Sequence, residues 1–129
     1  MEVEVIRPLK KLWENRPKSN LIQFMMKQSG VDRNRLTRYF GKRVDLFNNK
    51  LNRNTFTFEE IVTAAYACGF NIAFIKDEKI WLISRKDYMS PYAIDMAKKI
   101  FKEDLEDLEE KRKRYLALKA EMEKLEKEI

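Results

Sequence analysis

The sequence predicts a mainly α-helical fold, in which a small bundle of short helices is followed by a short β-hairpin and a long C-terminal helix. Between residues 20 and 70, short apolar stripes at helical spacing alternate with glycines and capping residues. Two β-prone runs then flank a polar tetrapeptide. Residues 91–129 contain no glycine, and their one proline stands at the first position, so they can form a continuous helix.

Residues 1–20 form an N-terminal extension for which two structures are open. Residues 3–6 suit a short strand, and residues 8–16 suit one or two helical turns. We expect Pro17 to end this segment, because proline disfavours helix in the residue before it.

The next two predicted helices are bounded by glycines. The first covers Asn20–Gln28 and ends at Gly30, which can take the left-handed conformation of a C-terminal cap. Asp32 is a good N-cap for the second helix, which ends at Gly41.

A third helix is predicted from Val44 to about Leu51, with Phe47 and Leu51 as its buried pair one turn apart. Two short helices joined by a tight turn form a helix-turn-helix, and the second helix of such a motif usually enters a DNA groove.

The fourth helix has the strongest local signals. Thr57 and Glu60 have the spacing of a capping box, and Phe56 and Ile61 have that of a hydrophobic staple. Gly69 is the expected C-terminal cap. The helix-turn-helix domain should therefore extend over residues 21–75.

A β-hairpin is predicted within residues 71–88. Asn71–Ile75 and Ile80–Ser84 are the strand candidates, and residues 76–79 form the connection.

The long helix is predicted over residues 90–129, with Ser90 as its N-cap and Pro91 at its first position. Apolar residues recur along it with the seven-residue period of a coiled coil, which favours a homodimer over a single solvated helix. The positions that we expect to dimerise are Ile94, Ala97, Phe101, Leu108, Tyr115, Leu118, Met122 and Leu125.

Asp104 and Lys111 interrupt this apolar seam. In a parallel dimer each would meet its own copy, whereas in an antiparallel dimer the two could face each other. Both orientations, and oligomers larger than a dimer, stay open at this point.

Positive charge is concentrated in the N-terminal half of the chain. Residues 1–56 carry 13 Lys/Arg and 5 Asp/Glu, an excess of 8 positive charges, whereas residues 57–129 carry 14 and 16. Such asymmetry is typical of a surface that binds a polyphosphate, although basic residues can also serve only solubility.

Several classes of function are disfavoured. The chain has no histidine and three glycines, so neither a histidine base nor a glycine-rich phosphate loop is available, and we expect no enzyme, metal site or cofactor. The single cysteine, Cys68, lies among alanines and is expected to be a small buried residue. With no membrane span and no signal peptide expected, we predict a cytoplasmic protein.

The helical pattern also supports a family resemblance. The second helix ends Leu36-Thr37-Arg38-Tyr39-Phe40-Gly41, the third reads Arg43 to Asn52, and the fourth closes with Cys68-Gly69-Phe70. In this spacing, residues 21–75 resemble the Cro/repressor (XRE-like) helix-turn-helix family. The resemblance implies a homodimeric transcriptional regulator, typically a repressor, that binds double-stranded DNA through the helix at residues 43–52.

Roles for the candidate DNA contacts follow from side-chain chemistry. The amides can pair with adenine and Arg43 with guanine, Val44 can touch a thymine methyl group, and Asp45 can accept from cytosine or orient an arginine. The other basic residues are expected at phosphates. An alternative for the amides is a merely polar outer face. The candidate residues are Arg33, Arg35, Arg38, Lys42, Arg43, Val44, Asp45, Asn48, Asn49, Lys50, Asn52 and Arg53.

A second function stays open beside DNA binding. Thr37 and Arg53 stand where the family often has a small residue and a glycine, and residues 44–46 are unusual for a groove-facing surface. The alternative is therefore a protein-interaction or inhibitor module on a helix-turn-helix scaffold, carried by a phage or another mobile element, with a protein partner.

Overall fold

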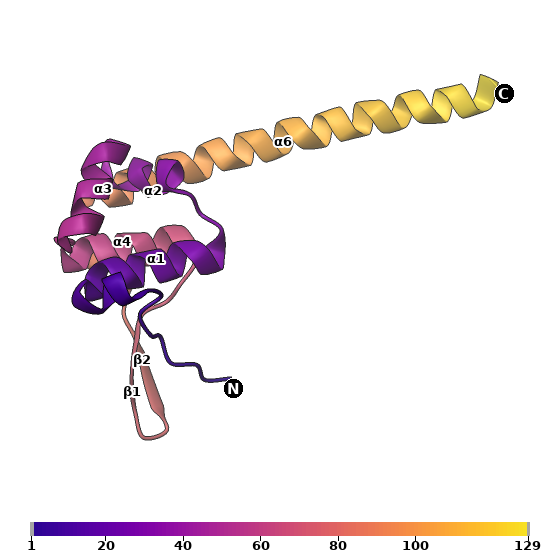
Figure 1. The fold of residues 1–129 in the computed structure, drawn as a ribbon. Coiled ribbons are helices and arrows are strands. Elements are labelled where there is room, and N and C mark those ends of the chain that lie inside the picture. The colour runs from indigo at the N-terminus through magenta and orange to yellow at the C-terminus, as the bar shows by residue number, and fades with distance from the viewer. Residues whose placement is uncertain (1, 129) are drawn as a thin grey trace. The chain divides into compact units, whose positions relative to one another are not determined.

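The computed structural model describes residues 2–128 and confirms the mainly α-helical fold with a two-stranded hairpin and a long C-terminal helix (Figure 1). The chain divides into two units, Met1–Met96 and Ala97–Ile129. In chain order the elements are η1 (Lys11–Asn15), α1 (Pro17–Ser29), α2 (Arg33–Phe40), α3 (Val44–Arg53), α4 (Phe58–Cys68), β1 (Ala73–Lys76), β2 (Lys79–Leu82), α5 (Arg85–Tyr88) and α6 (Pro91–Glu128).

The N-terminal extension follows one of its two expectations. Residues 3–6 are not a strand, whereas the short 3-10 helix η1 lies within residues 8–16, where one or two helical turns are expected. Pro17 begins α1 instead of ending the preceding segment. Proline suits the first helical position, because the N–H that it lacks would have no hydrogen-bond partner within the helix.

Asn20 ties this extension to α1. Its buried Oδ1 accepts from the Leu9 N–H (2.9 Å), and its Nδ2 donates to the Arg7 carbonyl (3.4 Å). A residue expected only to start a helix thus fixes the path of the chain before it.

The predicted helix caps are confirmed. The Asp32 carboxylate accepts a backbone N–H in the first turn of α2 (2.8 Å), and Gly41 ends α2 at φ +64°. Thr57 and Glu60 form the full capping box of α4, with bonds of 3.2 and 3.0 Å, and Gly69 ends α4 in the left-handed conformation. These contacts span three residues or fewer, which explains why local sequence predicts them.

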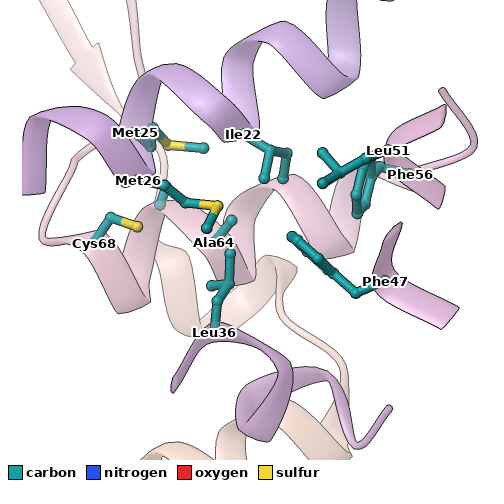
Figure 2. Close-up of a cluster of buried hydrophobic side chains, with 10 residues drawn as sticks. Ile22, Met25, Met26, Leu36, Phe47, Leu51, Phe56, Ala64 and Cys68 are labelled. Carbon is teal, nitrogen blue, oxygen red and sulfur yellow. The ribbon is translucent and has the colours of Figure 1, made fainter. Parts of the chain in front are cut away.

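The core is built around α4, which contacts α1, α2 and α5. Figure 2 shows side chains from α1, α2, α3 and α4 meeting in this cluster. Phe47 and Phe56 are almost completely buried, and their ring centroids lie 5.6 Å apart. Phe40 completes the aromatic cluster at 5.9 Å from Phe47 and 6.4 Å from Phe56. The inner face of α3 is therefore held on a rigid surface.

Asn54 couples the end of α3 to the start of α1. It is left-handed (φ 56°) and caps α3, and its Oδ1 accepts from the Ser19 N–H at 3.0 Å. Ser19 in turn donates from Oγ to the Leu51 carbonyl (2.6 Å), a bond that is buried. Arg16, the N-cap residue of α1, makes no side-chain bond to the helix. Asn54, which lies 35 positions after Ser19 in the chain, instead supplies an acceptor for the first turn of α1.

Replacing Asn54 by alanine should lower the free energy of unfolding by roughly 2 kcal/mol, because a cap bond is lost and an alanine is forced to positive φ. Glycine, which accepts this backbone conformation, should cost about half as much. Urea unfolding of both variants measures the difference. Equal stability of the alanine variant and the unmodified chain would contradict this role of Asn54.

The strands of the hairpin are shorter than expected, and the connection between them is tighter. Antiparallel pairing extends to Lys76 opposite Lys79, so Asp77 and Glu78 form a two-residue turn, with Asp77 at φ 56°. Every residue of both strands is exposed. The prediction that the hairpin region runs to residue 88 is wrong in its last part, because Arg85–Tyr88 forms α5.

The long helix begins as predicted, with the Ser90 hydroxyl accepting from the Ala93 N–H (3.2 Å). Its predicted last residue, Ile129, lies outside the described residues. Among the predicted dimerisation positions, Ile94 is half-buried and Ala97 is buried. The other six dimerisation candidates, Phe101, Leu108, Tyr115, Leu118, Met122 and Leu125, are 60–64% exposed.

Candidate nucleic-acid interface

The helix α3 has one buried and one exposed face. Phe47 and Leu51 point into the core at 0% and 3% exposure. The residues of α3 that are exposed are Asp45, Leu46, Asn49, Asn52 and Arg53, and Arg43 just before the helix is exposed as well. The amides Asn49 and Asn52 and the basic residues Arg43 and Arg53 therefore lie on the outer face of this segment.

The turn between α2 and α3 is tight. Gly41 takes the left-handed conformation, and the Lys42 N–H returns to the Thr37 carbonyl (3.3 Å). A Cβ at Gly41 would lie 2.6 Å from the Tyr92 ring. Glycine is favoured here mainly because φ is positive, since the Tyr92 ring is the far end of an exposed side chain that can move aside.

Arg33 and Asn48 join the start of α2 to the middle of α3. The Arg33 Nη1 donates to the Asn48 Oδ1 at 2.7 Å. This bond uses one acceptor site of the amide oxygen and leaves both Nδ2 hydrogens for another acceptor, such as N7 or O6 of a purine. The expected bidentate pairing of Asn48 with adenine would require its oxygen to be shared with Arg33.

Arg43 and Asp45 form an exposed pair, with Arg43 Nε 3.4 Å from Asp45 Oδ1. Of the two roles expected for Asp45, this contact favours the orientation of a neighbouring arginine over acceptance from cytosine. Both side chains are mostly solvent-exposed, so Arg43 can turn to a base or a phosphate at little cost.

Lys42 and Lys50 have a partner within the protein. Lys50 Nζ lies 2.7 Å from Glu60 Oε1, and Lys42 Nζ lies 3.8 Å from Glu60 Oε2. The Lys50 side chain is only 20% exposed and also lies over the Phe56 ring. The prediction of Lys50 as a phosphate contact does not fit this geometry, because its ammonium group is turned to α4 and neutralised there.

Glu60 thus binds two lysines in addition to capping α4. Local sequence reveals its capping role, but it does not reveal the contacts of Glu60 with Lys42 and Lys50. Burial on its own raises the pKa of Glu60, but hydrogen bonds from Lys50 and the Thr57 N–H, with the charges of both lysines, hold the pKa below its usual value. The pKa of Lys42 is lowered by burial and by the nearby Lys50, against the opposing effect of Glu60.

Replacing Glu60 by glutamine should lower the free energy of unfolding at pH 7 by about 1–3 kcal/mol, because the ion pairs with Lys50 and Lys42 are replaced by weaker bonds to a neutral amide. A carboxylate with a lowered pKa stabilises the fold above its unfolded pKa, and this contribution is lost as the pH falls through its folded pKa. The difference between the two proteins should accordingly shrink from about pH 5 to pH 3. Urea unfolding across this range measures it.

Glu59→Gln is the matched control, since Glu59 lies in the same helical turn and is exposed. We expect its effect to be smaller and to reflect only the helix dipole. A Glu60→Gln loss that is constant from pH 7 to pH 3 would contradict the assignment.

The remaining chemistry in the described part of the chain is limited. Cys68 is buried as expected, and burial raises the pKa of its thiol. Within residues 2–128, no three His, Cys, Asp or Glu side chains are grouped so that they could hold a metal ion. In the same range, no helix is both long enough and apolar enough to cross a membrane.

The structure brings most of the sequence-predicted residues into one region and separates a few. Residues of α2, the turn and α3 come together through the contact of α2 with α3 and the Arg33–Asn48 bond. Lys50 faces α4, and Val44 and Asn48 are half-buried. In comparisons with known proteins, the chain matches no family model, no curated protein and no solved structure.

Proposed function

We propose that this chain is a sequence-specific, DNA-binding transcriptional regulator that acts as a homodimer. The observation that carries the proposal is the outer face of α3, where Asn49 and Asn52 are exposed one turn apart beside Arg43 and Arg53. Amide groups read adenine edges in a major groove, whereas the two exposed arginines can bind guanine edges or the phosphates beside them.

Support for this face also comes from its rigidity. Phe47 and Leu51 anchor α3 in the core, and Asn54 holds its last turn against α1. A helix that is fixed at both its inner face and its end can present side chains to a base edge with little ordering cost.

The surrounding charge suits a polyphosphate. The N-terminal half of the chain has the positive excess, and α2 and the turn contribute exposed Arg33, Arg38 and Arg43 close to α3. Phosphate contacts by such residues would fix the position of the protein on the duplex, while the amides of α3 read its sequence.

Homodimerisation is proposed through α6. Six of its seam residues are largely exposed in the single chain, and an apolar stripe of this length on a solvated helix favours association with another helix. Two copies would present two reading helices to two half-sites, as in other dimeric helix-turn-helix proteins.

A salt titration tests the proposed DNA contact. Replacing Arg43 by alanine should weaken binding to all duplexes and flatten the plot of log K against log salt concentration by about one unit, as expected for one lost phosphate contact. The matched control is Lys50→Gln, which removes a lysine already neutralised by Glu60 and should leave the slope unchanged. Equal slopes for Arg43→Ala and the unmodified protein would contradict a contact at Arg43.

A second candidate function, a protein-interaction module, is favoured by the hairpin. Phe74 and Trp81 form a cross-strand pair and are 68% and 45% exposed, and Ile75 and Leu82 are 70% and 66% exposed. An isolated two-stranded hairpin is marginally stable in water, so an apolar hairpin of this kind suits contact with another protein.

The variant Phe74→Lys/Trp81→Lys separates the two functions. If the chain is a DNA-binding regulator, this variant should still shift DNA. Two results together would favour the interaction module. One is a protein that co-purifies in equal amounts with the unmodified chain and is lost from the variant, and the other is the absence of any DNA shift at low salt.

A further inference from the structure

The charges of α6 are arranged in two consecutive blocks of opposite sign. Residues 103–110 contain six acidic residues and no basic one, and residues 111–114 are Lys-Arg-Lys-Arg. Within one helix these blocks form pairs such as Glu110 with Arg114 (2.7 Å). Between two helices, the order of the blocks matters, because a parallel in-register pair places like charges side by side and an antiparallel pair centred near residue 110 places opposite charges side by side.

The apolar seam runs across both blocks. Phe101 and Leu108 lie beside the acidic block at 61% and 64% exposure, and Tyr115 and Leu118 lie just beyond the basic block at 64% and 60%. Burial of this seam is the driving force for pairing, and the charges select the partner's direction, because exposed ion pairs add little stability of their own.

We infer that α6 docks against α6 of a second copy of this chain in an antiparallel coiled coil in which Phe101 lies opposite Leu118 of the second copy. The inference rests on the self-association through α6 in the proposed function and is independent of DNA binding. It commits to an orientation and to a single register.

The seam supports this register. In an antiparallel coiled coil, the first seam position of each heptad lies opposite the second seam position of the other helix. With Phe101 opposite Leu118, Asp104 lies opposite Tyr115, and Leu108 lies opposite Lys111. The Tyr115 hydroxyl can then donate to the Asp104 carboxylate, and the Lys111 stem can cover Leu108 while its ammonium group reaches solvent.

The charges that flank the seam disfavour the antiparallel registers shifted by one heptad. In the inferred register, Asp107 of each copy lies beside Arg114 of the other. A shift by one heptad in one direction brings Arg114 beside Arg114, and a shift in the other direction brings Asp107 beside Asp107. In the parallel pair, Asp107 lies beside Arg112, but Arg114 lies beside Lys119. Asp104 and Lys111 also each meet their own copy within the seam, where like charges are most unfavourable.

A distance between spin labels tests the orientation in the full chain. Cys68 is replaced by alanine, and a nitroxide is placed on a cysteine at position 123, which is exposed and lies outside the seam; circular dichroism verifies that the fold is kept, with Cys68→Ser as a second background. In the inferred register the two 123 positions are 27 residues apart along the axis, which is about 40 Å at 1.5 Å per residue. A double electron–electron resonance distance near this value is the expected result.

A label distance below about 20 Å would mean a parallel pair and would overturn the inference while leaving the proposed homodimer intact. If light scattering shows a monomer at micromolar concentration, both the inference and the proposed self-association are overturned. This result would not bear on DNA binding by the helix-turn-helix domain of a single chain.

Charge exchange tests the register. Asp107→Arg and Arg114→Asp should each weaken self-association by about three- to tenfold, and the double variant should return to within about twofold of the unmodified chain. Glu106→Arg is the matched control, since position 106 lies on the side of the helix away from the seam, and it should have little effect. Tighter association of Arg114→Asp, or no recovery in the double variant, would overturn the register.

Discussion

Replacing Asn49 and Asn52 together by alanine is expected to weaken binding to the preferred DNA site by about 2–6 kcal/mol, because each bidentate amide–adenine pair contributes about 1–3 kcal/mol of discrimination. Both side chains are exposed on the outer face of α3, and their removal leaves the core residues Phe47 and Leu51 untouched. Binding to unrelated DNA should change little, because that binding depends on the basic residues. Fluorescence anisotropy with a preferred and a scrambled duplex at one salt concentration measures both effects.

The matched control for this double variant is Asn71→Ala, which removes an exposed amide outside α3. It should bind both duplexes like the unmodified chain. If the Asn49/Asn52 variant keeps its preference for one duplex, the amides of α3 are only a polar outer face.

Replacing Phe47 by alanine should lower the free energy of unfolding by about 3–5 kcal/mol, the range for removal of a buried aromatic ring. Phe47 is 0% exposed, and its ring contacts those of Phe40 and Phe56, so alanine leaves a cavity directly beneath α3. Such a loss is a large part of the stability of a typical domain, and DNA binding should fall with it. Urea unfolding followed by circular dichroism measures the change.

Phe74→Ala is the control for this loss, since Phe74 is 68% exposed on the hairpin. Its effect should stay within about 0.5 kcal/mol. A Phe47→Ala variant that is as stable as Phe74→Ala would contradict the aromatic support of α3.

The parts of the fold that the sequence predicts are those fixed by neighbours in the chain. The capping box of Thr57 and Glu60, the cap at Asp32 and the left-handed Gly41 and Gly69 each depend on contacts within a few residues. Their chemistry is therefore visible in a short stretch of sequence.

The features that the sequence could not predict depend on residues far apart in the chain. The bond from the Ser19 N–H to Asn54 spans 35 residues, and the bond from Lys50 to Glu60 spans 10. Lys50 has the side-chain chemistry of a phosphate contact. Only the packing of α3 on α4 reveals that Glu60 neutralises its charge. A proline at the first helical position is itself a local signal for the start of α1 at Pro17, but the acceptor for its first turn, Asn54, lies far along the chain.

For the candidate site, the sequence predicts the helix α3 and its outer face but not the state of each side chain. The spacing of Phe47 and Leu51 gives the outer face of α3 directly. The bond between Arg33 and Asn48 joins two helices and alters what Asn48 can offer a base. The exposed amides Asn49 and Asn52 consequently carry more of the proposed sequence reading than Asn48 does.

The central claim is that α3 reads a DNA sequence, and the most direct measurement is a selection of bound duplexes from a random pool, followed by titration of the selected and a scrambled duplex at physiological salt. The account predicts a common motif among the selected duplexes and an affinity ratio of about 10³ or more. Equal affinity for the two duplexes, or no binding to either at low salt, would contradict it.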